Sequence, residues 1–228
     1  IDWHEHNTLV KTAFPFDLRT ASVDAEIQFG HVNRPTHRNT SWDRARFECS
    51  MQRWVSMREP GFGAALLNDC KYGYDAKGNM LRLTMLRSPT YPWEQADQGE
   101  HRFRYALMVH DGDLVRVHEA AEEFNNPLRI ISGSSAAVLP FKVETPGVAV
   151  EAVKHAELDD GVIVRLWEVG ASERQISIWF DTSVTAVAIV DLLERDPRGL
   201  EMDAEGRIFL RLKPFEILTL KLTEKSKP

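Results

Sequence analysis

The chain has 228 residues, of which 43% are hydrophobic and 27% charged, and its formal net charge at pH 7 is −6. Its length allows one large β domain or two modest domains, and its composition excludes an intrinsically disordered, collagenous or low-complexity polymer. Lys and Arg number 28 against 34 Asp and Glu, which argues against nucleic acid as a partner, because such binding depends on attraction to phosphate. No run approaches the roughly 20 apolar residues that span a bilayer, so no membrane partner is expected.

The start of the chain and its cysteines favour a cytoplasmic location. The first residues, IDWHEHNTLVK, lack the basic start and the apolar run of a signal peptide. Cys49 and Cys70 are the only cysteines, and we expect both to be free thiols in a reducing compartment. Because the chain opens at Ile1 in strand-like sequence without an initiator Met, we expect a fragment of a longer protein.

Strand signals dominate the first half of the chain. Short runs rich in β-branched, aromatic and aliphatic residues are separated by turn residues, a pattern typical of β-sandwiches. Strands are predicted at residues 9–16, 23–29, 46–59, 64–68, 80–86 and 103–109. In the run 80–86, Arg82 and Thr84 fall on one face while Leu81, Leu83 and Met85 fall on the other. One face of that sheet is therefore predicted to be solvated.

A helix is predicted at residues 113–124 and a domain boundary just after it. Leu114, Val117, Ala121 and Phe124 recur at three- and four-residue spacing, and Asp113 can cap the first turn. The next stretch, 128–141, has the composition of turns and linkers. We therefore place the boundary near residue 128.

A second series of strands follows the boundary. Strands are predicted at residues 148–156, 161–169, 175–180, 185–190, 207–212 and 216–222, joined by turn sequences such as Asp196-Pro197-Arg198-Gly199. About 100 residues in six or seven short strands are typical of a small immunoglobulin-like β-sandwich. The sequence thus predicts an all-β chain with two domains, 1–127 and 128–228.

Motifs for catalysis and metal binding are weak. His4-Glu5-His6 places two imidazoles on one face of a strand, but two ligands leave a metal shell incomplete. We expect exposed polar positions there and no metal site. The sequence contains no G-x-S-x-G, H-E-x-x-H or paired C-x-x-C motif, so no catalytic residue is predicted and a complete small hydrolase is disfavoured.

Three polar segments, 34–44, 68–74 and 87–101, are dense in functional side chains. Their mixture of aromatic, charged and amide groups is the composition of a sugar platform and equally of a buried domain interface. If they serve one site, we expect them to cluster at one end of the first sandwich. In that case Asp97→Ala and His37→Ala should change the stability of the chain by no more than about ±0.5 kcal/mol.

At these segments the sequence resembles the C-terminal β region of the α-mannosidases of glycoside hydrolase family 38, in the cytosolic and bacterial branch. The matching runs are EIQFGHVNRPTHRNTSWDRARFE at 26–48, GFGAALLNDCKYG at 61–73, LRSP at 86–89, ADQGEH at 96–101 and YAL at 105–107. A looser likeness continues through DLLE at 191–194 and PFEI at 214–217. The resemblance therefore covers nearly the whole chain.

The resemblance implies that this chain is the non-catalytic end of a larger enzyme. Members of the family are retaining, metal-dependent exo-α-mannosidases whose nucleophilic aspartate and zinc ligands, including a His-x-Asp pair, lie in an N-terminal α/β domain followed by a helical bundle. No His-x-Asp occurs in this sequence. Residues 1–127 would be the later part of a large galactose-mutarotase-like β-sandwich, and residues 128–228 the terminal immunoglobulin-like β-sandwich. No cofactor is implied in this chain, since the zinc belongs to the missing catalytic domain.

The resemblance also implies partners. These are the N-terminal catalytic and helical domains of the same protein and a mannose-containing oligosaccharide. In the family, loops of this β region face the substrate or another domain. The resemblance implies the same position, with no chemical role assigned, for His37, Trp42, Asp43, Asp69, Lys71, Tyr72, Arg87, Asp97 and His101. Missing strands would leave an exposed edge, so that the sheet closes by itself or the chain forms a homo-oligomer. The alternative function is a free-standing carbohydrate-binding module, which needs an exposed aromatic platform.

Overall fold

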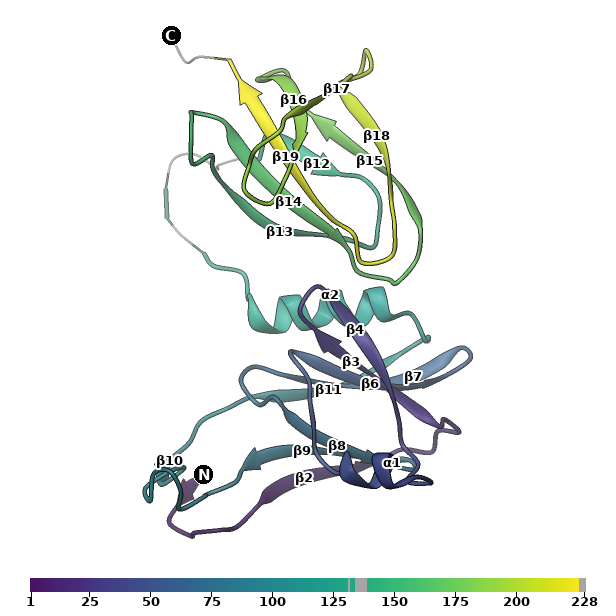
Figure 1. Cartoon of the computed structure of the whole chain (residues 1–228), viewed down its shortest axis with the longest axis vertical. Coiled ribbons are helices and arrows are strands. Elements are labelled where there is room, and N and C mark those ends of the chain that lie inside the picture. The colour runs from purple at the N-terminus through teal and green to yellow at the C-terminus, as the bar shows by residue number, and fades with distance from the viewer. Residues whose placement is uncertain (131, 134–138, 226–228) are drawn as a thin grey trace. The chain divides into compact units, whose positions relative to one another are not determined.

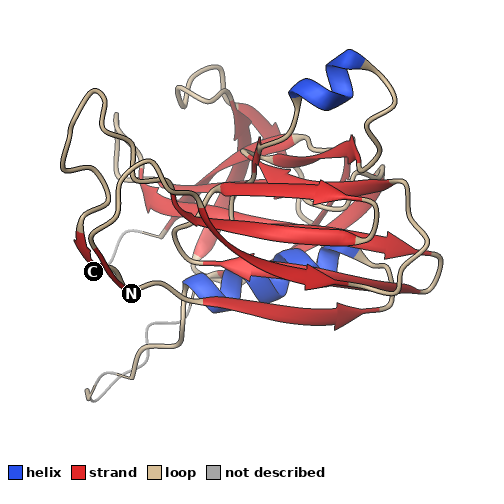
Figure 2. Cartoon of the chain, turned by 90° about the horizontal axis from the view of Figure 1, so that it is seen from below, coloured by secondary structure: helices blue, strands red, loops and turns tan. Residues whose placement is uncertain are grey.

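The computed structural model describes residues 1–130, 132–133 and 139–225 (Figure 1). The chain divides into two compact units, Ile1–Arg129 and Ile130–Pro228. Strands form nearly all of the regular structure (Figure 2), and every strand pair is antiparallel, so the predicted all-β class is confirmed. Residues 131 and 134–138 of the predicted linker lie outside the described residues.

Unit 1 contains two sheets and a short two-stranded pair. The five-stranded sheet has the order β11 (Tyr105–His110), β7 (Phe62–Asn68), β6 (Trp54–Glu59), β3 (Ser22–Ile27), β4 (Gly30–Pro35). The four-stranded sheet has the order β2 (Val10–Pro15), β9 (Met80–Leu86), β8 (Gly73–Lys77), β5 (Cys49–Ser50). The third pair joins β1 (Asp2–Trp3) to β10 (Gly99–Glu100).

The core of unit 1 lies between these two sheets. Alternation along the strands places Val55 and Met57 of β6, Leu66 of β7 and Leu81 and Leu83 of β9 in one buried cluster. Arg82 of β9 points away from the cluster, as the sequence predicted. Alternation therefore oriented Leu81 and Leu83 correctly, but a register shift at the end of the β2–β9 pairing interrupts it, so that Leu86 is buried and Met85, predicted on the buried face, is only half-buried.

Helix α2 (Leu114–Asn125) packs on the opposite face of the five-stranded sheet. Its Val117 and Ala121 are fully buried against Trp54, Ala65 and other residues of that face. Its N-cap is Asp113, whose side chain accepts a hydrogen bond from the Val115 N–H at 2.9 Å. Strands β6 and β7 of the five-stranded sheet are thus covered on both faces, which explains why they are buried over most of their length.

A network of charged side chains joins α2 to the sheet. The Glu26 carboxylate of β3 accepts from the Arg53 guanidinium at 2.6 Å and lies 3.4 Å from His118 Nδ1 of the helix. Arg53 also pairs with Glu122 of the helix. Burial alone would raise the pKa of Glu26, but hydrogen bonds from His118 and Arg53 outweigh it and hold the pKa below its usual value.

Several sequence-based assignments in unit 1 were wrong. The predicted strand 46–59 is two strands in different sheets, β5 and β6, because the chain crosses between the sheets at residues 51–53. The strands β1, β4, β8 and β10 and the short helix α1 (Ser41–Ala45) were missed. The sequence of β8, GYDAK, carries a charged residue at its centre, which breaks the apolar pattern by which a strand is recognised.

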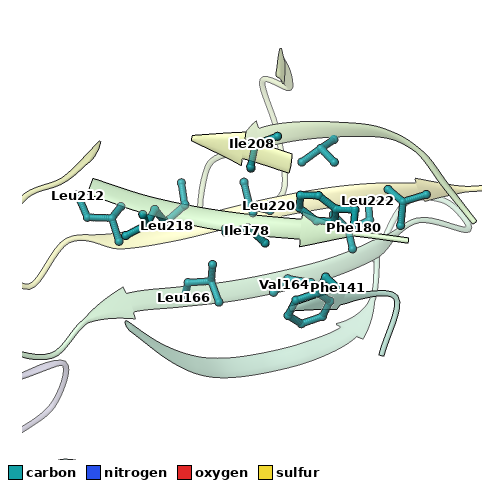
Figure 3. Close-up of a cluster of buried hydrophobic side chains, with 13 residues drawn as sticks. Phe141, Val164, Leu166, Ile178, Phe180, Ile208, Leu212, Leu218, Leu220 and Leu222 are labelled. Carbon is teal, nitrogen blue, oxygen red and sulfur yellow. The ribbon is translucent and has the colours of Figure 1, made fainter. Parts of the chain in front are cut away.

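Unit 2 is a sandwich of a three-stranded and a five-stranded sheet. The first has the order β12 (Phe141–Val143), β15 (Arg174–Phe180), β18 (Arg207–Leu212). The second has the order β13 (Val148–His155), β14 (Val162–Glu168), β19 (Ile217–Glu224), β16 (Val184–Val190), β17 (Arg198–Leu200). Figure 3 shows the side chains of its core gathered between the ribbons, with Leu166, Ile178 and Leu220 each fully buried.

A buried carboxylate fixes one end of unit 2. Glu168, at the end of β14, accepts hydrogen bonds from the backbone N–H groups of Gly170, Ser172 and Phe215 and from the Arg174 guanidinium at 3.3 Å. Its side chain is fully buried. Glu168 therefore ties the loop after β14 to the turn before β19.

No helix among the described residues has the length and apolar character needed to cross a membrane.

Candidate functional site

Two of the three polar segments emerge at the same end of unit 1. Segment 68–74 leaves β7 and enters β8, and segment 87–101 follows β9 and precedes β11. The register pairs Asn68 with Tyr105 and Gly73 with Thr84, so the strand ends that carry these segments lie next to one another. We call residues 68–72, 87–88 and 97–104 the loop cluster.

Asp69 is fixed within the loop cluster by Arg104. Its carboxylate accepts from the Arg104 backbone N–H at 3.0 Å and from Arg104 Nε at 3.2 Å. Burial alone would raise the pKa of Asp69, but these hydrogen bonds hold it below its usual value. The Lys71 ammonium lies over the Phe103 ring, 4.9 Å from its centroid, in a cation–π contact.

Asp97 holds residues 87–88 of the loop cluster in place through hydrogen bonds. Its Oδ2 accepts from the backbone N–H groups of Ser88 at 2.8 Å and Arg87 at 2.9 Å, which lowers the pKa of Asp97. The backbone carbonyl oxygen of Asp97 lies 2.9 Å from His101 Nε2. The His101 backbone N–H donates to the Ile1 carbonyl at 2.7 Å. Asp97 is therefore a structural residue, and the sequence-based expectation that it is an uncoupled surface site is wrong.

A depression of about 510 Å³ lies beside the cluster. Asp69, His101, Phe103 and Arg104 are among its lining residues. Arg87 and Tyr72 are exposed at the same end. This surface offers hydrogen-bond donors, a carboxylate and aromatic edges, groups that can contact either sugar hydroxyls or another protein domain.

The third segment, 34–44, lies at the opposite end of unit 1. Pro35 pairs with Ser22, and the Thr36 carbonyl accepts from the N–H of Gly78, which lies in the turn between β8 and β9, far along both strands from Gly73 and Thr84. The expected clustering of all three segments at one end is therefore wrong. Strand β4, which the sequence did not predict, pairs antiparallel with β3 and returns the chain to the opposite end of the sheet before segment 34–44 begins.

Segment 34–44 is built around helix α1. Thr40 and Asp43 form a capping box, with the Asp43 N–H donating to Thr40 Oγ1 at 3.1 Å and the Thr40 N–H donating to Asp43 Oδ2 at 3.0 Å. The Thr40 hydrogen bonds lower the pKa of Asp43, and His37 Nδ1 lies 3.5 Å from the same oxygen. Trp42 projects from α1 with 77% of its surface exposed.

The sequence missed a charged network on the outer face of the four-stranded sheet. Lys11 of β2 pairs with both Glu48 and Asp75, and Arg82 of β9 pairs with Asp75 at 2.7 Å. Asp75 is only 1% exposed although it faces outward. The solvated positions of β9 gave a partial signal, but Asp75 lies in the strand that was missed.

Two exposed aromatic residues of segment 87–101 were not among the individual residues carried over from the family. Tyr91 and Trp93 lie in the segment after β9 and are 87% and 65% exposed. The signal available was their position beside Pro89 and Pro92, without apolar neighbours that would bury them. They give segment 87–101 an exposed aromatic surface.

The carboxylates of the site are held in their charged form. Asp43, Asp69 and Asp97 all have pKa values lowered by hydrogen bonds. A general acid working near neutral pH needs a raised pKa. These three aspartates are therefore suited to hold loops and accept hydrogen bonds rather than to donate a proton.

Within residues 1–130, 132–133 and 139–225, no three His, Cys, Asp or Glu side chains gather so as to hold a metal ion. Cys49 and Cys70 are free thiols. Burial raises the pKa of both.

Comparisons with known proteins identify the family. The glycosyl hydrolases family 38 C-terminal domain matches residues 1–95, and the family's C-terminal beta sandwich domain matches residues 147–220. Alpha-mannosidase 2C1 of Homo sapiens is 41% identical over 238 residues, which cover 100% of this chain and 23% of that protein. Alpha-mannosidase G of Dictyostelium discoideum is 32% identical over 236 residues, which cover 97% of this chain and 21% of that protein. The chain thus spans less than a quarter of the length of these relatives.

A solved structure shares the fold. An alpha-mannosidase from Enterococcus faecalis V583 superposes with a TM-score of 0.76 at 20% identity, covering 94% of this chain and 26% of that one. The family matches fall in both units, and the relatives align along the whole chain. The chain belongs to the C-terminal β region of glycosyl hydrolase family 38.

Proposed function

We propose that this chain is the C-terminal, non-catalytic β region of a retaining exo-α-mannosidase, and that it supports the catalytic part of the parent protein. The observation that carries the proposal is the 41% identity to an alpha-mannosidase over the full length of this chain. The proposed partners are the catalytic and helical domains of the same polypeptide, and the proposed substrate is a mannose-containing oligosaccharide. The two free cysteines favour a reducing, cytoplasmic location.

The loop cluster supports a role in contacts with that catalytic part. Backbone hydrogen bonds and ion pairs hold its carboxylates, while Lys71, Tyr72 and Arg87 present side chains at the surface. Fixed loops with exposed polar and aromatic ends lose little conformational entropy when they bind. His37 and Trp42, at the other end of unit 1, would serve a separate contact.

Zinc is assigned to the catalytic part of the parent protein. Three or four protein ligands are needed to hold it, and the described residues provide no such group. The supporting role proposed for this chain therefore does not require a metal bound by its own residues.

The carbohydrate-binding module remains the second candidate, favoured by the exposed Tyr91 and Trp93. An aromatic pair on a surface loop can stack against a sugar ring. Binding of α-mannan by the 228-residue chain, abolished by Tyr91→Ala with Trp93→Ala, would favour the module over the support role. The support role predicts no measurable binding by the chain alone.

The proposed function is tested with the parent polypeptide. The 228-residue chain should not hydrolyse an aryl α-mannoside, whereas the parent should. In the parent, at least one of Lys71→Ala and His37→Ala should lower kcat/KM tenfold or more, about 1.4 kcal/mol of transition-state stabilisation. Lys142→Ala, an exposed position of unit 2, is the matched control. Zinc-dependent turnover by the 228-residue chain, or wild-type kinetics for both variants, would contradict the proposal.

A further inference from the structure

A depression of about 460 Å³ lies beside the charged network on the outer face of the four-stranded sheet. None of its lining residues belongs to the loop cluster. The lining includes three cations, one carboxylate and two apolar side chains: Lys11, Arg38, Arg82, Glu48, Phe47 and Leu9. Three cations against one carboxylate make this surface positive, although the chain as a whole has a formal net charge of −6.

The carboxylates of the network are already occupied by partners within the chain. Glu48 accepts from the Thr84 hydroxyl through Oε1 and from the Lys11 ammonium through Oε2. Lys11 also donates to Asp75, and Arg82 donates to Asp75 Oδ1 through Nε at 2.9 Å and Nη2 at 2.7 Å. In the part of the chain that the structure describes, Nη1 of Arg82 has no hydrogen-bond partner. The Arg82 guanidinium is therefore fixed in place with one nitrogen available to a ligand.

Arg38 contributes a second cation with free hydrogen-bond donors. Its side chain is half-buried, yet among residues 1–130, 132–133 and 139–225 it makes neither a hydrogen bond nor an ion pair. Partial burial of a charged group without a partner costs free energy, and a guanidinium carries five N–H donors. An anion in the depression would supply the missing partner. Beside it, Phe47 and Leu9 are 63% and 51% exposed and offer apolar surface to the rest of a ligand.

We propose that this depression binds an organic phosphate ester, with the phosphate group at Arg38 and Arg82 and the organic part against Phe47 and Leu9. Guanidinium groups match the geometry of phosphate oxygens and form charge-assisted hydrogen bonds with them. The volume of the depression is within the range of small-molecule sites. The inference goes beyond the proposed supporting role, because it assigns a ligand to this chain itself.

A carboxylate ligand, such as an acidic peptide, fits the depression less well. A carboxylate carries one negative charge and two acceptor oxygens, whereas a phosphate monoester carries a charge of about −1.5 to −2 at pH 7 and three strong acceptor oxygens. Two guanidinium groups that approach one anion are balanced better by the phosphate.

Isothermal titration calorimetry of the 228-residue chain tests the proposal. The probes are AMP and glucose 6-phosphate, inorganic phosphate, and the neutral compounds adenosine and glucose. At least one of the two esters should bind with a Kd of about 1 mM or lower, inorganic phosphate should bind more weakly than that ester, and the neutral compounds should not bind. Absence of binding by both esters, equal affinity for inorganic phosphate, or equal affinity for a neutral compound would each overturn the proposal.

Substitutions locate the binding. Arg38→Gln should weaken binding of the ester about tenfold, the loss of one charge-assisted hydrogen-bonded contact. It should leave the melting temperature unchanged, because Arg38 has no partner among the described residues to lose. Arg116→Gln, which removes an exposed arginine of helix α2, is the matched control and should bind the ester as the wild type does. Wild-type affinity in Arg38→Gln, or equal weakening in Arg116→Gln, would overturn the proposal.

A second variant tests the apolar part of the site. Phe47→Ala should weaken binding of the ester without changing the affinity for inorganic phosphate, and unchanged affinity for both would count against the proposal. A hexa-aspartate peptide that binds more tightly than either ester would assign the depression to an acidic protein segment instead. These measurements do not use the parent polypeptide, so their outcome is independent of the proposed function.

Discussion

At the scale of single residues, Gly63 of β7 is required by a neighbouring imidazole. A Cβ at this position would lie 2.4 Å from two ring atoms of His110. That ring is fixed by Ser56 Oγ at 2.9 Å from Nε2 and by the Gly112 N–H, which donates to Nδ1 at 3.1 Å. Because the ring cannot move without losing these bonds, Gly63→Ala should lower the free energy of unfolding by about 1–3 kcal/mol in urea denaturation.

Gly199 of β17 provides the matched control for that substitution. It also lies in a strand, and a Cβ there would meet no atom within 4 Å. Gly199→Ala should therefore change the free energy of unfolding by less than about 0.5 kcal/mol. Equal effects of the two substitutions would show that the contact with His110 is not the cause.

The His110 ring should also make stability depend on pH. Burial lowers the pKa of His110 below its usual value of 6.5. The folded protein therefore binds fewer protons than the unfolded chain, so this contribution is complete above pH 6.5 and is lost as pH falls through the folded pKa. The stability difference between pH 7.5 and pH 5.5, measured by urea unfolding, should be smaller in His110→Gln than in the wild type, and an equal difference would contradict the assignment.

Substitution of Asp97 tests whether its hydrogen bonds stabilise the loop cluster. Asp97→Ala removes the acceptor for two backbone N–H groups, those of Arg87 and Ser88, and should cost about 1–2 kcal/mol of stability. Asp97→Asn keeps a carbonyl acceptor and should cost less. A stability change within experimental error for Asp97→Ala would restore the view of Asp97 as an uncoupled surface site.

At the scale of elements, helix α2 is held to the sheet by Arg53. Arg53→Met keeps the apolar stem of the side chain but leaves the Glu26 carboxylate buried without its cation. Breaking a buried ion pair by removing one partner costs about 3–5 kcal/mol. We expect a loss in this range in urea unfolding at pH 7 and faster amide exchange along α2. Arg116→Met, at an exposed position of the same helix, should change neither quantity.

At the scale of the whole molecule, each unit has its own core. Glu168→Ala removes the acceptor for three backbone N–H groups and the partner of Arg174 in unit 2. It should cost about 3–5 kcal/mol, and faster exchange should be confined to unit 2, with β6 and β7 of unit 1 unchanged. Glu173→Ala, whose carboxylate is half exposed and paired with Arg211, should have little effect. Faster exchange in both units would show that they unfold as one.

The sequence by itself determined the class of fold, most of the strands and the family. Alternation of apolar residues is a local property, so Leu81 and Leu83 of β9 were predicted on the buried face, and helix α2 with its Asp113 cap. Where the buried pattern was interrupted, sequence failed: β8 carries Asp75, which is buried by partners from β2 and β9 rather than by an apolar neighbourhood.

Only the tertiary structure decided which loops meet. Segments 68–74 and 87–101 come together and segment 34–44 does not, because the end at which a loop emerges depends on strand pairing between residues far apart in the chain. The same holds for Leu107 and Val109 in the predicted strand 103–109, which are 51% and 69% exposed, because strand periodicity does not report which side chains another layer covers.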